Sequence, residues 1–237
     1  MLTVTTSWDD GDVLDKRVVK ILDTYGLKGT FYIPKEYWGT RLSDAEIRNL
    51  SNTHEVGAHT LSHIDLSKAS EKQAQAEIQG SKEWLNEVCK KEIGMFCYPR
   101  GRYTPAVRDM TRAAGFRGAR TTRQFELSIS DPFEMPTSIQ VYPFPFRHDD
   151  GPKSFLEPLM QRYGGYRSLG VPLTGMRSWE SAAKAAFDFA RTKGGMFHIW
   201  GHSWELEKNG LWEQFDRVCS HIANREDCIY VTNGELV

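Results

Sequence analysis

Strand-type and helix-type patterns alternate about seven times along this chain of 237 residues. Residues 2–8 alternate apolar and polar side chains, which predicts a strand that ends at Asp9-Asp10-Gly11. Apolar residues at helical spacing follow from 13 to 22, and Gly26 stops that helix. This alternation is typical of a parallel α/β architecture, either a barrel or an open doubly wound sheet. We find no repeat and no linker, so the sequence predicts one domain over residues 1–237.

The other elements are predicted from the same periodicities and from helix-capping signals. Ser43 and Glu46 form a capping box that begins one helix, and Thr104-Pro105 begins another that Gly115 ends. Residues 124–176 have a poorer pattern, with one helix expected near 153–163. After the first strand, the predicted strands are 29–33, 56–59, 95–98, 116–121, 195–200 and 228–232. The helices predicted after the first, including the two just described, are 43–50, 70–91, 104–115, 178–192 and 211–223.

Four segments rich in polar and aromatic residues lie at the ends of predicted strands. In parallel α/β folds the carboxyl ends of the strands share one face, and active sites form there. We therefore expect these segments to meet at one site. They are residues 8–11 (WDDG), 59–63 (HTLSH), 96–101 (FCYPRG) and 198–205 (HIWGHSWE).

The first two segments contain side chains suited to a catalytic metal site. His59 and His63 are four residues apart, so on a helical turn they share a face and can hold one ion. Asp9 and Asp10 are adjacent and point in different directions, so one can bind the ion while the other accepts a proton. Either pattern alone is more often a solvated helix face or a turn. Together they leave coordination positions open for water and substrate, as a catalytic site requires.

These segments resemble the motifs of the polysaccharide deacetylase family, also called the NodB-homology fold or carbohydrate esterase family 4. Residues 7–11 are similar to its T-F-D-D-G motif, and residues 59–63 to its H-[ST]-x-x-H motif. Residues 96–101 resemble its third motif, and residues 200–202 its final hydrophobic-x-His motif. The resemblance implies a distorted (β/α) barrel of about seven parallel strands. It also implies an enzyme that removes an acetyl group from an N-acetylated sugar or polysaccharide precursor.

The resemblance also implies roles for the first two motifs. Asp9 would be the general base, and Asp10, His59 and His63 would hold one divalent metal ion. Zinc is the expected ion, with cobalt or nickel as alternatives. Such an ion lowers the pKa of water and polarises the amide carbonyl, while Asp9 takes up the proton.

The later motifs would supply the oxyanion site, substrate contacts and the acid. The backbone N–H of Arg100 is expected to share the oxyanion with the metal. Tyr98 in the same segment and Trp200, as a wall of the acyl pocket, are the other expected substrate contacts. His202 would protonate the departing amine.

The sequence departs from the family pattern at two places. The third motif usually carries an arginine that steadies the base, and here Cys97 occupies that position. Arg120, at the end of the next strand, could replace it, although a surface arginine is the simpler interpretation. The aspartate motif that usually orients the catalytic histidine is not found.

Two histidines near the last motif compete for the role of the acid. His198 and His202 share one strand face and would lie roughly 13 Å apart on an extended strand. Because the site should form at the carboxyl end of the strand, His202 is the expected acid and His198 a core or supporting histidine.

Tryptophans flank the motifs and suit stacking on sugar C–H surfaces. Trp8 is the better candidate for core packing, whereas for Trp204 stacking and core packing stay open.

The net charge, the apolar runs and the cysteines indicate which partners and which cellular compartment to expect. The net charge is −1, with no basic block, so neither nucleic acid nor an anionic membrane is indicated. No run of apolar residues is long enough to insert into a membrane, and no leader sequence is recognised. Four cysteines without a C-x-x-C pair suit a reducing compartment, so a cytoplasmic protein is expected. The expected partner is a carbohydrate, and no feature indicates an oligomeric state.

Three other functions compete with sugar deacetylation. One is hydrolysis of another amide, such as a formamide or a non-sugar amide. Another is a degenerate carbohydrate-binding module that keeps the fold without turnover, which the altered third motif favours. A third is a non-haem iron oxygenase, because two histidines and a carboxylate also suit iron, although those ligands are expected on a β-rich scaffold.

Overall fold

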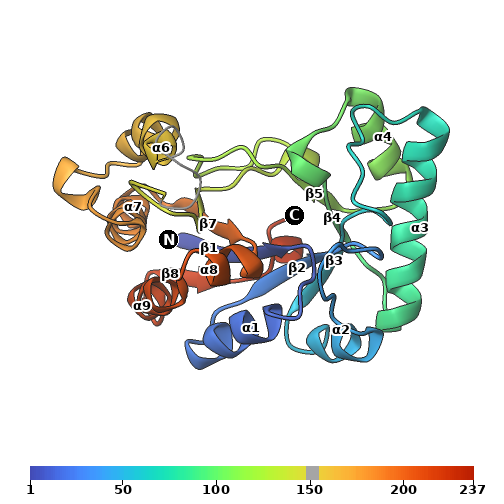
Figure 1. Cartoon of the computed structure of the whole chain (residues 1–237), viewed down its shortest axis with the longest axis horizontal. Coiled ribbons are helices and arrows are strands. Elements are labelled where there is room, and N and C mark those ends of the chain that lie inside the picture. The colour runs from blue at the N-terminus through green and yellow to red at the C-terminus, as the bar shows by residue number, and fades with distance from the viewer. Residues whose placement is uncertain (148–154) are drawn as a thin grey trace.

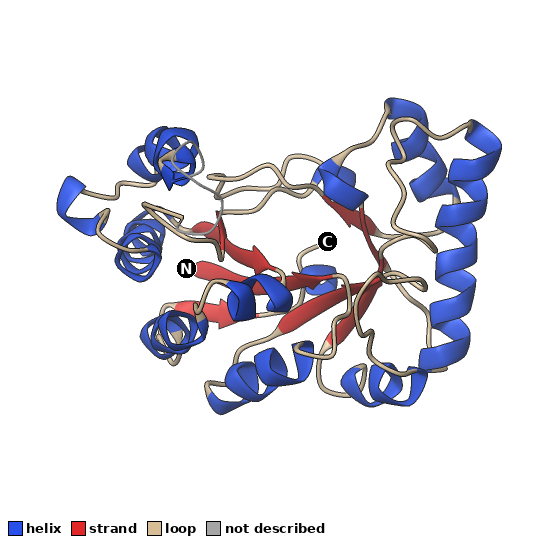
Figure 2. Cartoon of the chain, viewed as in Figure 1, coloured by secondary structure: helices blue, strands red, loops and turns tan. Residues whose placement is uncertain are grey.

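The structure is a computed structural model that describes residues 1–147 and 155–237. Its strands form one curled parallel sheet, and helices cover the outer side of the curl (Figure 1, Figure 2). The strands are β1 (Leu2–Asp9), β2 (Gly29–Ile33), β3 (Glu55–Ala58), β4 (Met95–Cys97), β5 (Gly118–Arg120), β6 (Ile139–Gln140), β7 (Gly195–Gly201) and β8 (Cys228–Tyr230). The helices are α1 (Asp15–Thr24), α2 (Asp44–Leu50), α3 (Glu71–Cys89), α4 (Pro105–Ala113), α6 (Glu157–Ser168), α7 (Trp179–Lys193), α8 (Ser203–Lys208) and α9 (Trp212–Ile222).

Seven strands follow one another in the order β5-β4-β3-β2-β1-β7-β6, and all pairings between them are parallel. β1 is an inner strand with three partners. It pairs with β7 along almost its whole length, while its other edge pairs first with β8 and then with β2.

The curl does not close into a regular barrel. Among the described residues, no ladder joins β5 to β6. Instead, Arg120 and Met135 form one isolated parallel bridge, and the N–H of Ser138 donates to the carbonyl of His198. The prediction of a distorted α/β barrel of about seven parallel strands is therefore confirmed.

Most elements lie where the sequence patterns predict them, because local signals determine their ends. Ser43 caps α2 with the expected capping box, and Gly26 takes the left-handed conformation after α1. The helix expected near 153–163 is α6, and the part of that prediction over residues 153–154 lies outside the described residues. The short elements β6 and α8 were not predicted.

The sheet is buried on both faces, as a parallel sheet flanked by helices requires. All five residues of β2 are buried. Trp8 points to the helical side, where its ring lies 4.9 Å from that of Phe215 on α9, so core packing is confirmed for this residue. Of the four cysteines, none of which is in a disulfide, only Cys228 is partly exposed.

The interior of the curl contains a small apolar cluster, made of Tyr32, Met95, Cys97 and Met135, beside a network of hydrogen-bonded polar groups. A short 3₁₀ turn (Asn233–Glu235) lies inside the curl near the end of the chain (Figure 1). The side-chain oxygen of Asn233 accepts from Thr5 on β1 at 2.9 Å, and its amide donates to the Tyr32 hydroxyl at 2.9 Å. The backbone N–H of Gly234 donates to Glu55 at 2.8 Å. This network fills one end of the curl, and the candidate site lies at the other.

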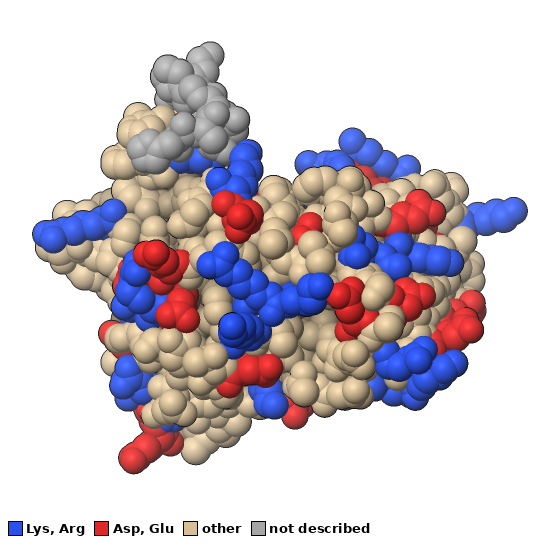
Figure 3. Space-filling model, turned by 60° about the horizontal axis from the view of Figure 1, so that its bottom comes forward, with Lys and Arg blue, Asp and Glu red and all other residues tan. Residues whose placement is uncertain are grey.

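On the face of the molecule shown in Figure 3, acidic and basic side chains are interspersed, and neither sign of charge dominates. Within the described residues, no helix has the length and apolar character needed to span a bilayer.

Candidate active site and metal centre

The loop after β1 turns sharply and presents two carboxylates in different directions. Asp10 has φ 80° and Gly11 φ 65°, so both residues are left-handed. Two features exclude a side chain at Gly11. Its positive φ disfavours any residue with a Cβ, and a Cβ would lie 2.6 Å from the side chain of Ile33 on β2. A left-handed aspartate is uncommon and is typical of functional sites.

The histidine loop after β3 is irregular, which corrects the expectation of a helical turn. Thr60 and His63 have positive φ, and residues 59–63 are not helical. Glu77 on α3 holds this loop in place, because its carboxylate accepts hydrogen bonds from the backbone N–H groups of Leu61 and Ser62 at 2.8 and 2.9 Å. The two histidines therefore converge through loop geometry rather than helical spacing.

Asp10, His59 and His63 converge as a possible metal-binding group. Oδ1 of Asp10 lies 3.9 Å from Nε2 of His59 and 3.5 Å from Nε2 of His63. Zinc ligands about 2.1 Å from the ion lie roughly 3.4 Å apart in a tetrahedral site, so this spacing fits such an ion.

The surrounding hydrogen bonds orient these ligands. Nδ1 of His59 lies 2.8 Å from the carbonyl oxygen of Cys97, so it donates there and leaves Nε2 free to bind a metal. Burial lowers the pKa of His59 to about 4, so the ring is neutral, as a ligand must be. The other oxygen of Asp10 accepts from the indole N–H of Trp204 at 3.0 Å.

Asp9, His59 and Cys97 form a second group with atoms at ligand spacing. This group is the poorer metal site. Burial raises the pKa of the Cys97 thiol well above its usual value, so the thiol is protonated. The guanidinium of Arg120 contacts Asp9 and would repel a cation placed there.

Arg120 is fully buried and forms an ion pair with Asp9, so the interpretation as a surface arginine was wrong. Arg120 and Cys97 are directly paired across β5 and β4, which explains how an arginine on the next strand reaches the base. Burial alone would raise the pKa of Asp9. Arg120, His59 and His202 outweigh that effect, so the pKa lies below its usual value and Asp9 is ionised.

His202 follows the end of β7 and is held by a carboxylate that sequence reasoning missed. Its Nδ1 donates to Oε2 of Glu205 at 2.7 Å, and that oxygen also accepts from Gln140 at 3.3 Å. Nε2 of His202 lies 4.0 Å from oxygens of both Asp9 and Asp10. The one sequence signal for this contact was that Glu205 follows His202 by three residues, a spacing at which two side chains can meet on a helical turn.

The same carboxylates determine the charge of His202. Burial would lower its pKa, but Glu205, together with Asp10 and Asp9, raises it to about 9. The ring is therefore protonated at neutral pH and has a proton to donate.

His198 lies deeper in the curl, as expected for a core histidine. Its Nδ1 lies 3.1 Å from the carbonyl oxygen of Pro136, and its Nε2 accepts from the hydroxyl of Ser7 at 2.8 Å. Burial lowers its pKa to about 3, so the ring is neutral.

The third segment presents backbone rather than side chains to the site. Arg100 has φ 58° and an exposed side chain, and its backbone N–H donates to no other described residue. The side chain of Tyr98 is fully buried, its ring is stacked on Tyr103, and its hydroxyl donates to the carbonyl of Phe133. Tyr98 is therefore placed as a core residue and offers no side-chain surface to a substrate, contrary to the expectation.

Trp200 lies among the candidate catalytic side chains. It is 5% exposed, with its ring 5.5 Å from that of His202 and 4.7 Å from the guanidinium carbon of Arg120. Within the described part of the chain, its indole N–H has no hydrogen-bond partner. A buried donor of this kind is available to a bound ligand.

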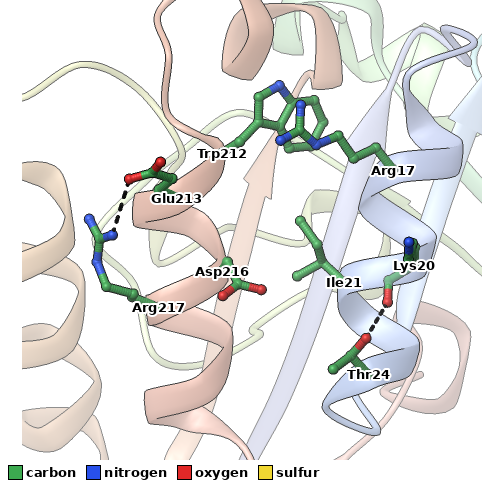
Figure 4. A pocket seen from close by; sticks show the side chains of 8 residues that line it. All are labelled: Arg17, Lys20, Ile21, Thr24, Trp212, Glu213, Asp216 and Arg217. Atoms are coloured by element: carbon green, nitrogen blue, oxygen red, sulfur yellow. Dashed lines mark hydrogen bonds and ion pairs between the residues drawn. The ribbon is translucent and has the colours of Figure 1, made fainter.

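A separate hollow lies on the outer surface between α1 and α9 (Figure 4). It is lined by Arg17, Ile21, Trp212 and Asp216 among others, and it contains none of the residues of the four motifs. The hollow is therefore separate from the candidate site.

This chain is similar to known proteins in sequence and in fold. The family described as polysaccharide deacetylase matches residues 2–119. YxkH of Bacillus subtilis, which is named for that family, is 23% identical over 123 residues. That match covers 50% of this chain and 44% of YxkH, so it spans less than half of the relative.

Solved structures share the fold over nearly the whole chain. A protein of Mycobacterium smegmatis named for the same family has a TM-score of 0.68 at 17% identity, covering 99% of this chain and 88% of that one. A family 4 acetyl xylan esterase of Clostridium thermocellum, solved with a cobalt ion, has a TM-score of 0.60 at 18% identity, covering 99% and 89%. A Bacillus anthracis pseudoenzyme of carbohydrate esterase family 4 has a TM-score of 0.55 at 12% identity, covering 93% and 60%.

Proposed function

Because this chain belongs to the polysaccharide deacetylase family, we propose that it is a metal-dependent hydrolase that removes the acetyl group from an N-acetylated sugar. The observation that carries the proposal is the convergence of three side chains suited to a cation, Asp10, His59 and His63, beside an ionised and buried Asp9. The substrate would be a carbohydrate, and the cytoplasmic location expected from the cysteines stays a prediction.

Asp10, His59 and His63 would hold the divalent cation, for which zinc is our first choice and cobalt or nickel the alternatives. When bound there, such an ion would lower the pKa of a water molecule and polarise the acyl carbonyl. With only three protein ligands, the ion would keep coordination positions for a water molecule and for the substrate.

Asp9 would take the proton from the attacking water. It is ionised, and Arg120 fixes one of its oxygens while the other faces His202 at 4.0 Å. A base held in one orientation loses little entropy in reaching the transition state.

The backbone N–H of Arg100 would donate to the oxyanion, since it has no partner within the described residues and its left-handed conformation is held by the turn at 99–101. Trp200 would form a wall of the acyl pocket, with its unpartnered indole N–H as a further donor. Of the substrate contacts expected from the sequence, we retain Arg100 and Trp200 and give up the side chain of Tyr98.

His202 would protonate the nitrogen that departs as the amine. Its proton is available at neutral pH because Glu205 raises its pKa, and Glu205 also fixes the ring through Nδ1 so that Nε2 faces the site. Glu205 would thus take the place of the aspartate motif that the sequence lacks.

A binding module without turnover is the second candidate. It is favoured by the likeness to a family 4 pseudoenzyme and by the cysteine in the third motif. The pairing of Arg120 with Asp9 weakens it, because the base keeps a cationic partner despite Cys97.

An acetate-release assay separates the two candidates. We expect the zinc-loaded protein to release acetate from N-acetylated oligosaccharides or sugar nucleotides, to stop after chelation, and to resume when zinc or cobalt is added. Binding of the same sugars without any release would identify a binding module. Full activity after exhaustive chelation, with loss of metal confirmed by mass spectrometry, would exclude the metal-dependent mechanism.

Replacing His202 by alanine should preserve the metal content but lower turnover of a sugar amide by about 10²-fold, because the amine then leaves without its proton donor. The loss should be smaller on an activated acetyl ester, whose leaving group departs unprotonated. His198→Ala is the matched control, and it should mainly lower the melting temperature, since His198 bridges Ser7 and Pro136 in the core. Equal losses of the H202A variant on amide and ester would contradict the role of the acid.

A further inference from the structure

A buried arginine is linked through one amide to the carboxylate that holds the candidate acid. Arg162, on α6, is 9% exposed, and it forms no ion pair with a carboxylate of the described residues. An arginine that is removed from water without a carboxylate beside it is costly to the fold. The groups that it contacts therefore indicate what its charge is used for.

Arg162 donates to the side chain of Gln140 on β6. Its Nη2 lies 2.9 Å from Oε1 of Gln140, and its guanidinium carbon lies 4.4 Å from the centre of the Tyr142 ring. The Nε2 group of Gln140 donates in turn to Oε2 of Glu205 at 3.3 Å, and this is the oxygen that accepts from His202. Gln140 is therefore a bridge between the arginine and the carboxylate.

The chemistry of the guanidinium determines which way the Gln140 amide points. An arginine side chain has only donors, so the carbonyl oxygen of the amide is the one group that can meet it. The NH₂ group of the amide must then face Glu205, which accepts from it. Without Arg162 the amide could turn round and place its oxygen against the carboxylate, where two acceptors would repel each other.

The backbone of Gln140 is also held in place. Strand β6 pairs with β7 so that Gln140 lies beside Trp200, two residues before His202. The indole N–H of Trp179 on α7 donates to the backbone carbonyl of Gln140 at 2.7 Å. This strand of two residues thus presents one amide to Glu205 from a fixed position.

We propose that Gln140 and Arg162 are positioning residues for the candidate acid. Arg162 orients the amide of Gln140, and this amide holds the carboxylate that orients the ring of His202. The inference rests on the proposed function. Its competitor is a purely structural role, in which Arg162 only fastens α6 to the sheet.

Gln140→Glu separates these two roles. The substituted carboxylate gives Arg162 an ion-pair partner, so the melting temperature should not fall, but it cannot donate to Glu205 and brings a like charge beside it. We expect Q140E to lower kcat for the sugar amide about tenfold with little change in KM, a smaller loss than removal of the acid itself. Hydrolysis of an activated acetyl ester should stay near the wild-type rate. Full kcat on the amide in folded, zinc-loaded Q140E, or equal losses on amide and ester, would overturn the inference.

Variants of Arg162 test whether the arginine acts through the same amide. R162M lets the amide turn and should lower kcat on the sugar amide about as much as Q140E, whereas R162K keeps a donor for Oε1 and should recover most of that loss. Arg167→Met is the matched control, because Arg167 lies on the same helix but is exposed, and it donates to the carbonyl of Val171 at 2.9 Å. Equal losses in R162M and R162K would contradict the proposal.

A double variant tests whether the bridge acts through His202. Q140E/H202A should be no slower on the sugar amide than H202A alone, because both changes disable the same group. A further loss in the double variant would show that Gln140 acts elsewhere and would overturn the inference.

A spectroscopic measurement keeps the inference separate from the proposed function. The proton between Nδ1 of His202 and Glu205, whose atoms are 2.7 Å apart, should give a resonance far downfield in the proton NMR spectrum, and H202A identifies it by its loss. If no variant releases acetate, the deacetylase proposal fails, but this resonance still decides the role of Gln140. It should shift or broaden in Q140E and R162M and stay unchanged in R167M. An unchanged resonance in Q140E and R162M, or no such resonance in the wild type, would overturn the inference.

Discussion

Asp9→Asn and Asp10→Ala should both abolish useful activity, but for different reasons. The D9N variant should keep its metal and lose roughly 10²–10⁴-fold in kcat, because only the base is removed. The D10A variant should lose metal affinity by more than about tenfold, since changing even a group that only supports a metal ligand commonly costs that much. Metal content after dialysis, measured by mass spectrometry beside kcat, distinguishes the two.

The buried ion pair adds a cost to the first variant. D9N leaves the guanidinium of Arg120 without a counter-charge in a fully buried position, so its melting temperature should also fall. The double variant D9N/R120M removes both charges and is the matched control: it should be more stable than D9N and equally inactive. If D9N empties the metal site while D10A retains the metal, the two aspartates have been assigned the wrong roles.

Removing Arg120 alone should damage both stability and turnover. R120M leaves Asp9 buried and unpaired, which should lower the free energy of unfolding by about 3–5 kcal/mol. In the molecules that remain folded, a base without its fixed partner should cost about 10²-fold in kcat. Arg117→Met is the control, because Arg117 lies near the start of the same strand but is exposed. Urea unfolding and acetate release measure the two effects.

A swap of two residues tests whether Arg120 replaces the usual arginine of the third motif. Cys97 and Arg120 are paired in register, and the Cys97 sulfur lies 3.9 Å from an oxygen of Asp9. The double variant C97R/R120C moves the guanidinium to the neighbouring strand at a similar distance from the base. It should recover most of the activity that R120M loses. Activity as low as that of R120M, in a folded and metal-loaded protein, would show that the position on β5 itself is required.

The sequence predicted the parts of the site that local patterns encode. Predicted strands of a parallel sheet precede Asp10, His59 and His63. The carboxyl ends of such strands necessarily meet at one edge of the sheet. The geometry of the histidine loop was not predictable, because it depends on Glu77 from α3 and on backbone angles that no periodicity reports.

The pairings between distant residues could not be predicted either. Arg120 and Asp9 are 111 positions apart, and only the register between β4 and β5 shows that Arg120 lies beside Cys97 and within reach of Asp9. Glu205 lies on α8, a helix of six residues too short to give a periodic signal. The strand β6, with two residues, was missed for the same reason.

The place of β1 between β2 and β7 in the sheet has a consequence for biosynthesis. Among the strands that the structure describes, β1 leaves the ribosome first, yet its longest ladder is with β7, some 190 positions later in the chain. Until β7 is synthesised, one edge of β1 exposes unpaired backbone groups and is open to pairing with another nascent chain. Native pairing therefore has to wait for a contact of very large sequence separation, which slows folding and lengthens the period of vulnerability to aggregation. Chaperone demand during translation should accordingly depend on the speed at which the segment between β6 and β7 is made.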